Sequence, residues 1–447
     1  MKHSVIVEYK RCRGCTTCIK SCPTEAIRVR HGKATILADR CIDCGTCMQV
    51  CPHHAVRAVP DRFESLHKYD YRIALPDPAL YGQFQNLDDV NIVLNGLLEV
   101  GFDGVYEVAK AAEYLTDAVR DQVLTSEPAA MPRISSACPT VLRLICMRFP
   151  KLIANIQNSI APMELAAILA RSEAVEKTGL PPERIGVFGI VPCPSRVTAA
   201  HTPVALQQPV LNGAFAIRDV YRQLLTPMKE LKELRPLSSS GLTGVGWAFC
   251  GGEAEARQGQ NYLAVDGIEN VIRMLEEIED GRLPDVDFIE LNACVEGCVG
   301  GCLTVENPFA AHMRLKKLMR DVPDCGNRFA DLDVPAEALK TDKELEYVPA
   351  LLLDTDRGAA MKKMMQIEML EEQLPGLCCG SCGAPSCRAF AEDVVLGRAS
   401  EADCIFKVRE RMQRMAGRSD ADEYLPAPFR QQRLQPNEKV LEVHSLR

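Results

Sequence analysis

The sequence predicts an α/β protein that carries a cysteine-rich unit toward each end. Two short apolar runs, residues 185–191 and 286–291, have the length and composition of buried strands. Segments around them carry helix start and stop signals, and many of the cysteines lie outside this middle region. The expected parts are 1–60, 73–350, 370–410 and a charged tail over 411–447.

The composition is that of an ordinary globular protein and argues against several function classes. The chain has 447 residues, of which 47% are apolar and 25% charged, and a net charge of −8. The sequence lacks the basic stripe with interleaved aromatic residues that would indicate nucleic-acid binding. It also lacks an apolar run that approaches the ~18 residues of a membrane span. The first residues lack a secretory signal pattern, and the 21 cysteines suit metal binding better than disulfides. We expect a cytoplasmic protein with no nucleic-acid partner and no membrane span.

Helix signals and strand ends organise the middle part. Asp88 and Asp89 suit the cap of a helix that runs to Gly101, and Pro162 suits the first turn of another. Both strand-like runs lead into a cysteine within three residues. Because ligand sites in α/β sheets favour the carboxyl ends of strands, these cysteine loops are candidate site segments.

The first 58 residues contain two similar cysteine runs with the spacing C-x2-C-x2-C-x3-C-P. This is the bacterial ferredoxin spacing, in which the fourth cysteine of one run binds the cluster of the other run. The predicted ligands are Cys12, Cys15, Cys18 and Cys51 for one [4Fe-4S] cluster and Cys41, Cys44, Cys47 and Cys22 for the second. The alternative is a zinc site or a disulfide knot, although zinc sites usually separate two C-x2-C pairs by a longer spacer.

Four further cysteines stand in loops that are far apart in sequence. They are Cys138, Cys193, Cys294 and Cys298, each beside proline or glycine. Gly297, Gly300 and Gly301 allow the backbone to approach a bulky cofactor closely. The alternative is a set of buried structural thiols with a flexible glycine loop.

In order, these loops resemble the three signature segments of the [FeFe]-hydrogenase catalytic domain. The segments are Ser135–Pro139, Val191–Arg196 and Glu290–Cys302. Further matches are Gly101–Asp103, Val105–Val108, Ala161–Pro162 and Gly251–Ala256. The resemblance covers about residues 1–350 and implies a two-lobed α/β catalytic domain after an α+β domain of the bacterial ferredoxin type.

The resemblance also implies a specific cofactor and reaction. Cys138, Cys193, Cys294 and Cys298 would hold a [4Fe-4S] cubane, and Cys298 would bridge to a diiron unit with CO, cyanide and dithiolate ligands. The implied reaction is reversible heterolytic H2 oxidation, with H2 and protons as substrates and diiron maturation factors as partners. Residues that would lie against this cofactor are Ser136, Ala137, Pro192, Asn292 and Gly297.

The chain departs from the family at several of these positions. Ala137 stands where active members have a proton-shuttling cysteine, and Arg196 stands where the family uses lysine to hold a cyanide. Loss of a relay group typically removes a 10²–10⁴-fold contribution, so slow turnover is expected. Candidate substitute relays are Glu290, Glu296 and Cys302, although each is equally suited to a satisfied polar or small residue.

Near the end of the chain, Cys379, Cys382, Cys387 and Cys404 have the spacing C-x2-C-x4-C-x16-C. This pattern is similar to a small [4Fe-4S] module of corrinoid iron–sulfur proteins and membrane electron-transfer subunits, and the alternative is zinc. Residues 355–372 are expected to form a helix whose methionines fill a core.

Three hypotheses follow. The first is a slow, H2-responsive oxidoreductase that reports H2 or redox state to a partner, which is a ferredoxin-like or signalling protein. The second is a catalytic hydrogenase with a different proton path in an electron-transfer complex. The third is an electron-transfer protein that never receives the diiron unit. Infrared bands of CO and cyanide separate the first two from the third.

Overall fold

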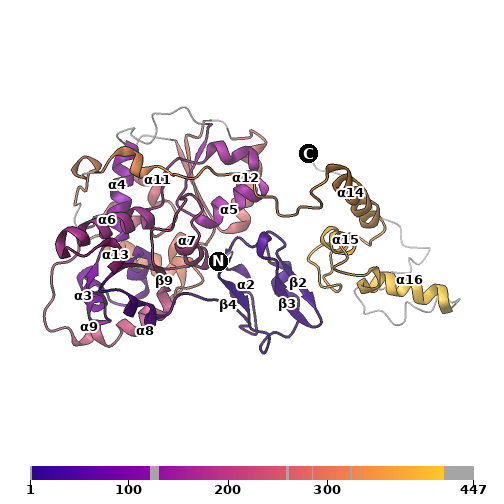
Figure 1. The fold of residues 1–447 in the computed structure, drawn as a ribbon, viewed down its shortest axis with the longest axis horizontal. Helices are drawn as coiled ribbons and strands as arrows, with labels where there is room; N and C mark the ends of the chain where they lie inside the picture. Colours follow the sequence, from indigo (N-terminus) through magenta and orange to yellow (C-terminus); the bar gives the residue numbers. More distant parts are fainter. Residues whose placement is uncertain are drawn as a thin grey trace, which may run out of the picture. The chain divides into compact units, whose positions relative to one another are not determined.

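The computed structural model describes residues 3–120, 130–257, 261–283, 285–322, 325–332 and 334–416 (Figure 1). The chain divides into two compact units, residues 1–352 and 353–447. The first unit contains both parallel sheets and the N-terminal cysteine runs, and the second contains the C-terminal cysteines. In the described part of the chain, no helix is long and apolar enough to cross a membrane.

The N-terminal part is built from two antiparallel strand pairs and two one-turn helices. The pairs are β1–β4 and β2–β3, with Val5 opposite Ala58 and Ile27 opposite Ile36. The elements are β1 (Val5–Val7), α1 (Thr17–Lys20), β2 (Ile27–Arg30), β3 (Lys33–Ile36), η1 (Ala38–Arg40), α2 (Thr46–Gln49) and β4 (Val56–Ala58). Its small core includes the cysteines themselves, because few other apolar side chains are available to fill it.

The first parallel sheet has the strand order β6-β5-β8-β9. Its strands are β5 (Tyr71–Pro76), β6 (Gly104–Val105), β8 (Ile185–Val191) and β9 (Gly213–Ala216). Alternate residues of β8 point to opposite cores: Val187 and Val191 enter one, and Phe188 and Ile190 the other. A strand covered on both faces needs an apolar side chain at nearly every position, which explains the uninterrupted apolar run.

Helices cover both faces of this sheet. The elements around it are η2 (Phe63–Lys68), η3 (Pro78–Gln83), α3 (Val90–Glu99), α4 (Val108–Arg120), α6 (Pro162–Thr178), η5 (Pro182–Arg184), α7 (Pro194–His201), α8 (Ile217–Leu224) and α9 (Pro227–Glu230). The predicted helix after Asp89 is α3, and the Asp89 carboxylate accepts a hydrogen bond from the Asn91 N–H at 2.8 Å. The helix predicted to open at Pro162 is α6.

The second parallel sheet has the order β10-β11-β7 and its own core. The elements of this region are β7 (Arg133–Ile134), α5 (Pro139–Arg148), η4 (Pro150–Asn155), α11 (Gly252–Ala256), β10 (Tyr262–Asp266), α12 (Ile268–Glu279) and β11 (Phe288–Asn292). Five later elements pack instead against the cores of the first sheet: α10 (Leu242–Gly246), η6 (Gly297–Gly300), α13 (Pro308–Leu318), η7 (Phe329–Asp331) and η8 (Ala336–Leu339). The strand predicted over 286–291 is β11. Two parallel sheets with separate cores confirm the predicted two-lobed α/β class.

The second unit consists of α14 (Arg357–Glu372), α15 (Cys387–Val395), η9 (Glu401–Asp403) and α16 (Ile405–Ala416). The helix predicted over 355–372 is confirmed as α14, but the role expected for its methionines is wrong. Met361, Met365 and Met369 are 70%, 56% and 59% exposed, because Ile367 and Leu370 face the core instead. Residues 417–447 of the predicted tail lie outside the described residues.

Candidate functional site

Three strand ends deliver the four scattered cysteines to one place. Cys138 follows β7 and precedes α5, and Cys193 follows β8 and precedes α7. Cys294 follows β11, and Cys298 lies one turn further on in η6. Because β8 belongs to one sheet and β7 and β11 to the other, the four cysteines meet where the carboxyl ends of the two sheets converge.

The four thiols line a single cavity of about 730 Å³, which is open in part to solvent. Of the residues predicted to lie against a cofactor, Ala137, Pro192, Asn292 and Gly297 also line it. Ser136 does not line this cavity and instead faces two neighbouring ones. Gly297 has φ = +75°, and a Cβ there would lie 2.6 Å from the backbone nitrogen of Cys250, so a glycine is required at this turn.

Burial makes these thiols costly to ionise in the absence of a partner. It raises the pKa of Cys193 to about 12 and that of Cys298 to about 12, and it raises the pKa of Cys294 well above its ordinary value. The mutual proximity of the cysteines raises all three values further. Thiols that are buried and crowded in this way suit binding to a metal cluster, which takes them as thiolates.

Arg196 is the charged group that offsets the thiolates. Its Nη2 donates to the sulfur of Cys298 at 3.7 Å, and its Nη1 lies 3.7 Å from an oxygen of Asp77. Burial alone would lower the pKa of Arg196, but Cys298, Asp77 and Cys193 raise it overall. Four thiols from three loops beside one largely buried cation form a donor set that fits an anionic cubane.

Besides Asp77, the buried carboxylates of Glu253 and Glu290 line the same cavity. Glu290, at the end of β11, accepts hydrogen bonds from the N–H groups of Gly251 and Ala254 at 3.1 and 2.9 Å, and from Asn292. Burial, followed by the neighbouring carboxylate of Glu253, raises the pKa of Glu290 to about 7. A carboxyl group with this pKa can exchange a proton near neutral pH.

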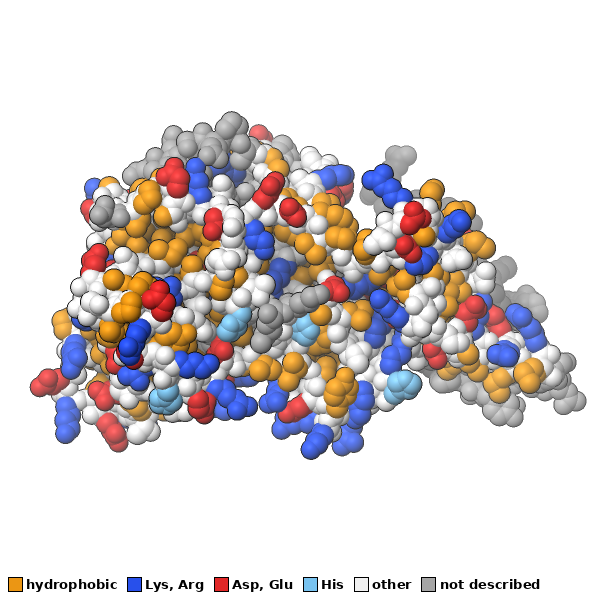
Figure 2. Space-filling model, viewed as in Figure 1, with side chains coloured by type: hydrophobic (Ala, Val, Ile, Leu, Met, Phe, Trp, Pro, Cys, Tyr) orange, Lys and Arg blue, Asp and Glu red, His pale blue; other side chains and the backbone are white. Residues whose placement is uncertain are grey.

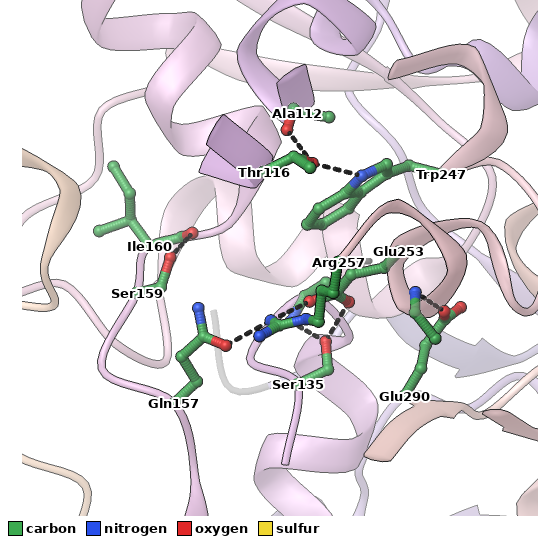
Figure 3. Close-up of polar contacts among 12 residues, drawn as sticks. Ala112, Thr116, Ser135, Gln157, Ser159, Ile160, Trp247, Glu253, Arg257 and Glu290 are labelled. Carbon is green, nitrogen blue, oxygen red and sulfur yellow. Dashed lines mark hydrogen bonds and ion pairs between the residues drawn. The ribbon is translucent and has the colours of Figure 1, made fainter. Parts of the chain in front are cut away.

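Glu253 connects this cavity with a second, smaller one. The Ser135 hydroxyl donates to Glu253 at 2.5 Å, and Arg257 donates to it at 3.0 Å (Figure 3). Arg257 also donates to Gln157, so a continuous polar chain leads away from the first cavity. Ala137 and Glu253 line both cavities. The sequence alone predicts no role for Glu253, although Gly251–Ala256 is one of the segments that resemble the family.

Two of the candidate relays lie elsewhere. Glu296 pairs with His312 of α13, and its backbone N–H donates to Asp266, so it belongs to a separate, partly buried cluster. Cys302 packs toward Met48 and Gly45 of the second cysteine run. Neither is among the described residues that line the cavity, so of the three proposed relays only Glu290 lies in its wall.

The eight N-terminal cysteines fall into two groups. Burial raises the pKa of Cys18 to about 11, and Cys12, Cys15 and Cys51 raise it further. The pKa of Cys47 is raised by burial and then by Cys44, Cys22 and Cys41. Cys51 thus lies near the first run and Cys22 near the second, and Cys18 also contributes to the raised pKa of Cys47. The assignment of the eight cysteines to two clusters stays a prediction.

In the second unit, Cys404 is buried, and Cys382 and Cys387 pack partly buried beside the same core. Cys379 is half-buried, whereas Cys378 is exposed. The Cys378 sulfur accepts a hydrogen bond from the Cys387 N–H at 3.4 Å. The assignment of Cys379 rather than Cys378 as the ligand stays a prediction.

Comparison with known proteins agrees with this geometry. A family model described as the iron only hydrogenase large subunit, C-terminal domain, matches residues 71–207 and 215–302. A 4Fe-4S dicluster domain model matches residues 4–52, and an Fe-S cluster model matches residues 374–406. The chain therefore belongs to the iron-only hydrogenase family and carries an N-terminal ferredoxin-like domain.

Solved structures show the same fold. The apo form of [FeFe]-hydrogenase HydA1 from Chlamydomonas reinhardtii, in a cysteine-to-histidine variant, matches with a TM-score of 0.50 and 15% sequence identity. The match covers 64% of this chain and 98% of that one. A glutamate-to-glutamine variant of the same enzyme gives the same four values. At this identity the likeness concerns the fold alone.

Proposed function

We propose that this protein is a slow, H2-responsive oxidoreductase that reports H2 or redox state to a partner protein. The observation that carries the proposal is the arrangement of one cavity. It combines four partly buried thiols and a largely buried guanidinium with alanine at position 137, where the family has its proton-shuttling cysteine. The site can hold the cofactor, but it lacks the thiol that serves rapid proton transfer.

In this proposal Cys138, Cys193, Cys294 and Cys298 would hold a [4Fe-4S] cubane, and a diiron unit would be held beside Cys298. When bound, that unit supplies the chemistry that splits and forms H2. Arg196 donates toward Cys298 and is suited to orient an anionic ligand of the unit. Its buried partner Asp77 fixes the direction of the guanidinium.

Protons take a route through carboxylates instead of a thiol. Glu290 lies in the cavity wall, and Glu253 stands between that cavity and the Ser135–Gln157 polar chain. Each carboxylate can take up and release a proton, whereas the alanine methyl group cannot. A route that lacks the family's thiol explains slow rather than absent turnover.

Electrons pass through the N-terminal clusters to an acidic redox partner. Residues 1–60 contain ten Lys and Arg against four Asp and Glu, whereas the whole chain has a net charge of −8. Lys and Arg side chains gather over the end of this domain near β2 and β3 (Figure 2). Lys10, Arg11 and Arg13 are exposed beside Cys15, which is itself exposed. A basic surface around Cys15, a predicted ligand of the first [4Fe-4S] cluster, favours association with an acidic protein.

Anaerobic loading with a synthetic diiron precursor, followed by infrared spectroscopy under argon and then under H2, tests the proposal. CO and cyanide bands that shift under H2, together with slow H2 turnover, are expected. Bands with fast turnover would favour a catalytic hydrogenase with another proton path. Absence of the bands after loading would favour an electron-transfer protein.

A further inference from the structure

Cys302 occupies the junction between the ferredoxin-like domain and the catalytic cavity. Its sulfur lies 3.9 Å from the sulfur of Met48 in α2. A Cβ built on Gly45 would lie 2.3 Å from the Cys302 sulfur, so the thiol rests directly on the Gly45 backbone. Gly45 in turn follows Cys44, a predicted ligand of the second ferredoxin-type cluster.

On its other side, Cys302 adjoins the loops of the cavity. Burial raises its pKa, and the next contributions come from Cys193 and Cys44, which belong to the two different predicted clusters. Cys294 also has Cys302 as a near neighbour. The Leu303 N–H donates to the Pro192 carbonyl at 2.8 Å, which fixes this segment against the Cys193 loop.

A buried polar clamp holds the two domains together at this point. The Asp43 carboxylate accepts hydrogen bonds from Arg143 at 2.9 Å and from Thr198 at 2.8 Å. The Ser4 hydroxyl donates to the Pro194 carbonyl at 2.8 Å. Because Asp43 lies between Cys41 and Cys44, the clamp fixes the second cysteine run against α5 and α7. These contacts hold Cys302 in place between the second cysteine run and the cavity.

We propose that Cys302 is the packed contact through which an electron passes between the second ferredoxin-type cluster and the cavity cubane. One electron leaves one cluster and enters the other; no bond forms or breaks, and the thiol is neither oxidised nor reduced. Cys302 is thus a positioning residue for electron transfer, and the side chain excludes water from the gap between two sets of sulfur ligands. The inference requires both clusters but does not require H2 chemistry.

The test uses the full chain reconstituted with iron and sulfide, without the diiron precursor. A photochemical reductant injects electrons on a flash, and freeze-quench EPR follows their arrival at the cubane. Cys302→Gly, which empties the junction, is compared with Cys302→Ser, which nearly fills it. Cys146→Ala, which alters a buried thiol of α5 away from the junction, is the matched control.

Electron arrival is expected to slow several-fold in Cys302→Gly, to slow less in Cys302→Ser and to stay unchanged in Cys146→Ala. Equilibrium EPR titrations should show midpoint potentials within ~59 mV of the parent, which corresponds to a tenfold change in a one-electron equilibrium. An unchanged rate in Cys302→Gly would overturn the inference. A slower electron arrival together with a midpoint-potential shift larger than ~59 mV would overturn it as well. The slower rate would then result from a changed driving force and not from the lost contact. If Cys302→Gly fails to load clusters, Cys302→Ala replaces it with the same expectations.

Discussion

Arg196 donates to the Cys298 sulfur at 3.7 Å and, through its other terminal nitrogen, lies 3.7 Å from Asp77. One buried cation thus serves both a predicted cluster ligand and a carboxylate that is almost inaccessible to solvent. Burial raises the pKa of Asp77, and Arg196 opposes that rise. The guanidinium therefore has a structural and an electrostatic role in the same cavity.

Arg196→Met is expected to lower the free energy of unfolding by about 3 kcal/mol, because it leaves Asp77 buried without its counter-charge. Chemical denaturation of the cluster-free protein measures the change. The double variant Arg196→Met/Asp77→Asn should recover much of the loss, since it removes the unpaired carboxylate as well. Equal destabilisation of the single and double variants would show that the pair does not interact.

Ala137→Cys is expected to increase H2 turnover of the loaded protein by about 10²-fold, because it restores a proton-transferring thiol at the cavity wall. Ala137→Ser is the matched control, since it adds a side chain of similar size with a far less acidic proton. Amperometric H2 assays measure both variants. If serine and cysteine give the same rate, the missing thiol does not limit turnover.

Glu253→Gln is expected to reduce turnover by at least about 10²-fold, because the amide keeps the shape of the side chain but cannot relay a proton. Glu255 lies on the same helix, α11, but is exposed, so Glu255→Gln is the matched control. Infrared spectra should show the same cofactor bands in both variants. A normal rate in Glu253→Gln would remove the carboxylate from the proton route.

The pH dependence of turnover should report the protonation of Glu290. H2 oxidation needs a carboxylate that can accept a proton, so its rate should rise as pH increases through about 7, and proton reduction should fall over the same range. Glu290→Gln should remove this inflection. Because the folded protein holds this proton more tightly than the unfolded chain, the free energy of unfolding should also fall as pH rises from 4.5 to about 7. The same inflection in Glu290→Gln would assign it to another group.

Local signals in the sequence were sufficient to predict two of the strands, β8 and β11, and the cysteine loops that follow them. The run 185–191 is apolar at every position because both faces of β8 are covered, and that property is visible without a structure. Asp89 and Pro162 mark helix starts through their own backbone chemistry. The predicted division of the N-terminal cysteines into two ligand sets likewise follows from their spacing over a short stretch of chain.

Features that depend on distant partners could not be predicted in this way. Cys302 was considered as a proton relay, but its neighbour Met48 is 254 residues away and places it at the domain junction. Glu253 acquires its role through Ser135, which is 118 residues away. The methionines of α14 have a helical spacing that suits burial. The sequence, however, does not reveal which face of the helix packs against the rest of the protein.

Iron analysis combined with EPR of the reconstituted full chain tests whether the four distant cysteines hold one cubane. Single alanine variants of Cys138, Cys193, Cys294 and Cys298 are compared with the parent protein. Each variant is expected to lose the same EPR signal and the iron of one cluster, while the ferredoxin-type signals remain. Retention of that signal in the alanine variants, or zinc in place of iron in the parent site, would show that these cysteines do not share one [4Fe-4S] cluster.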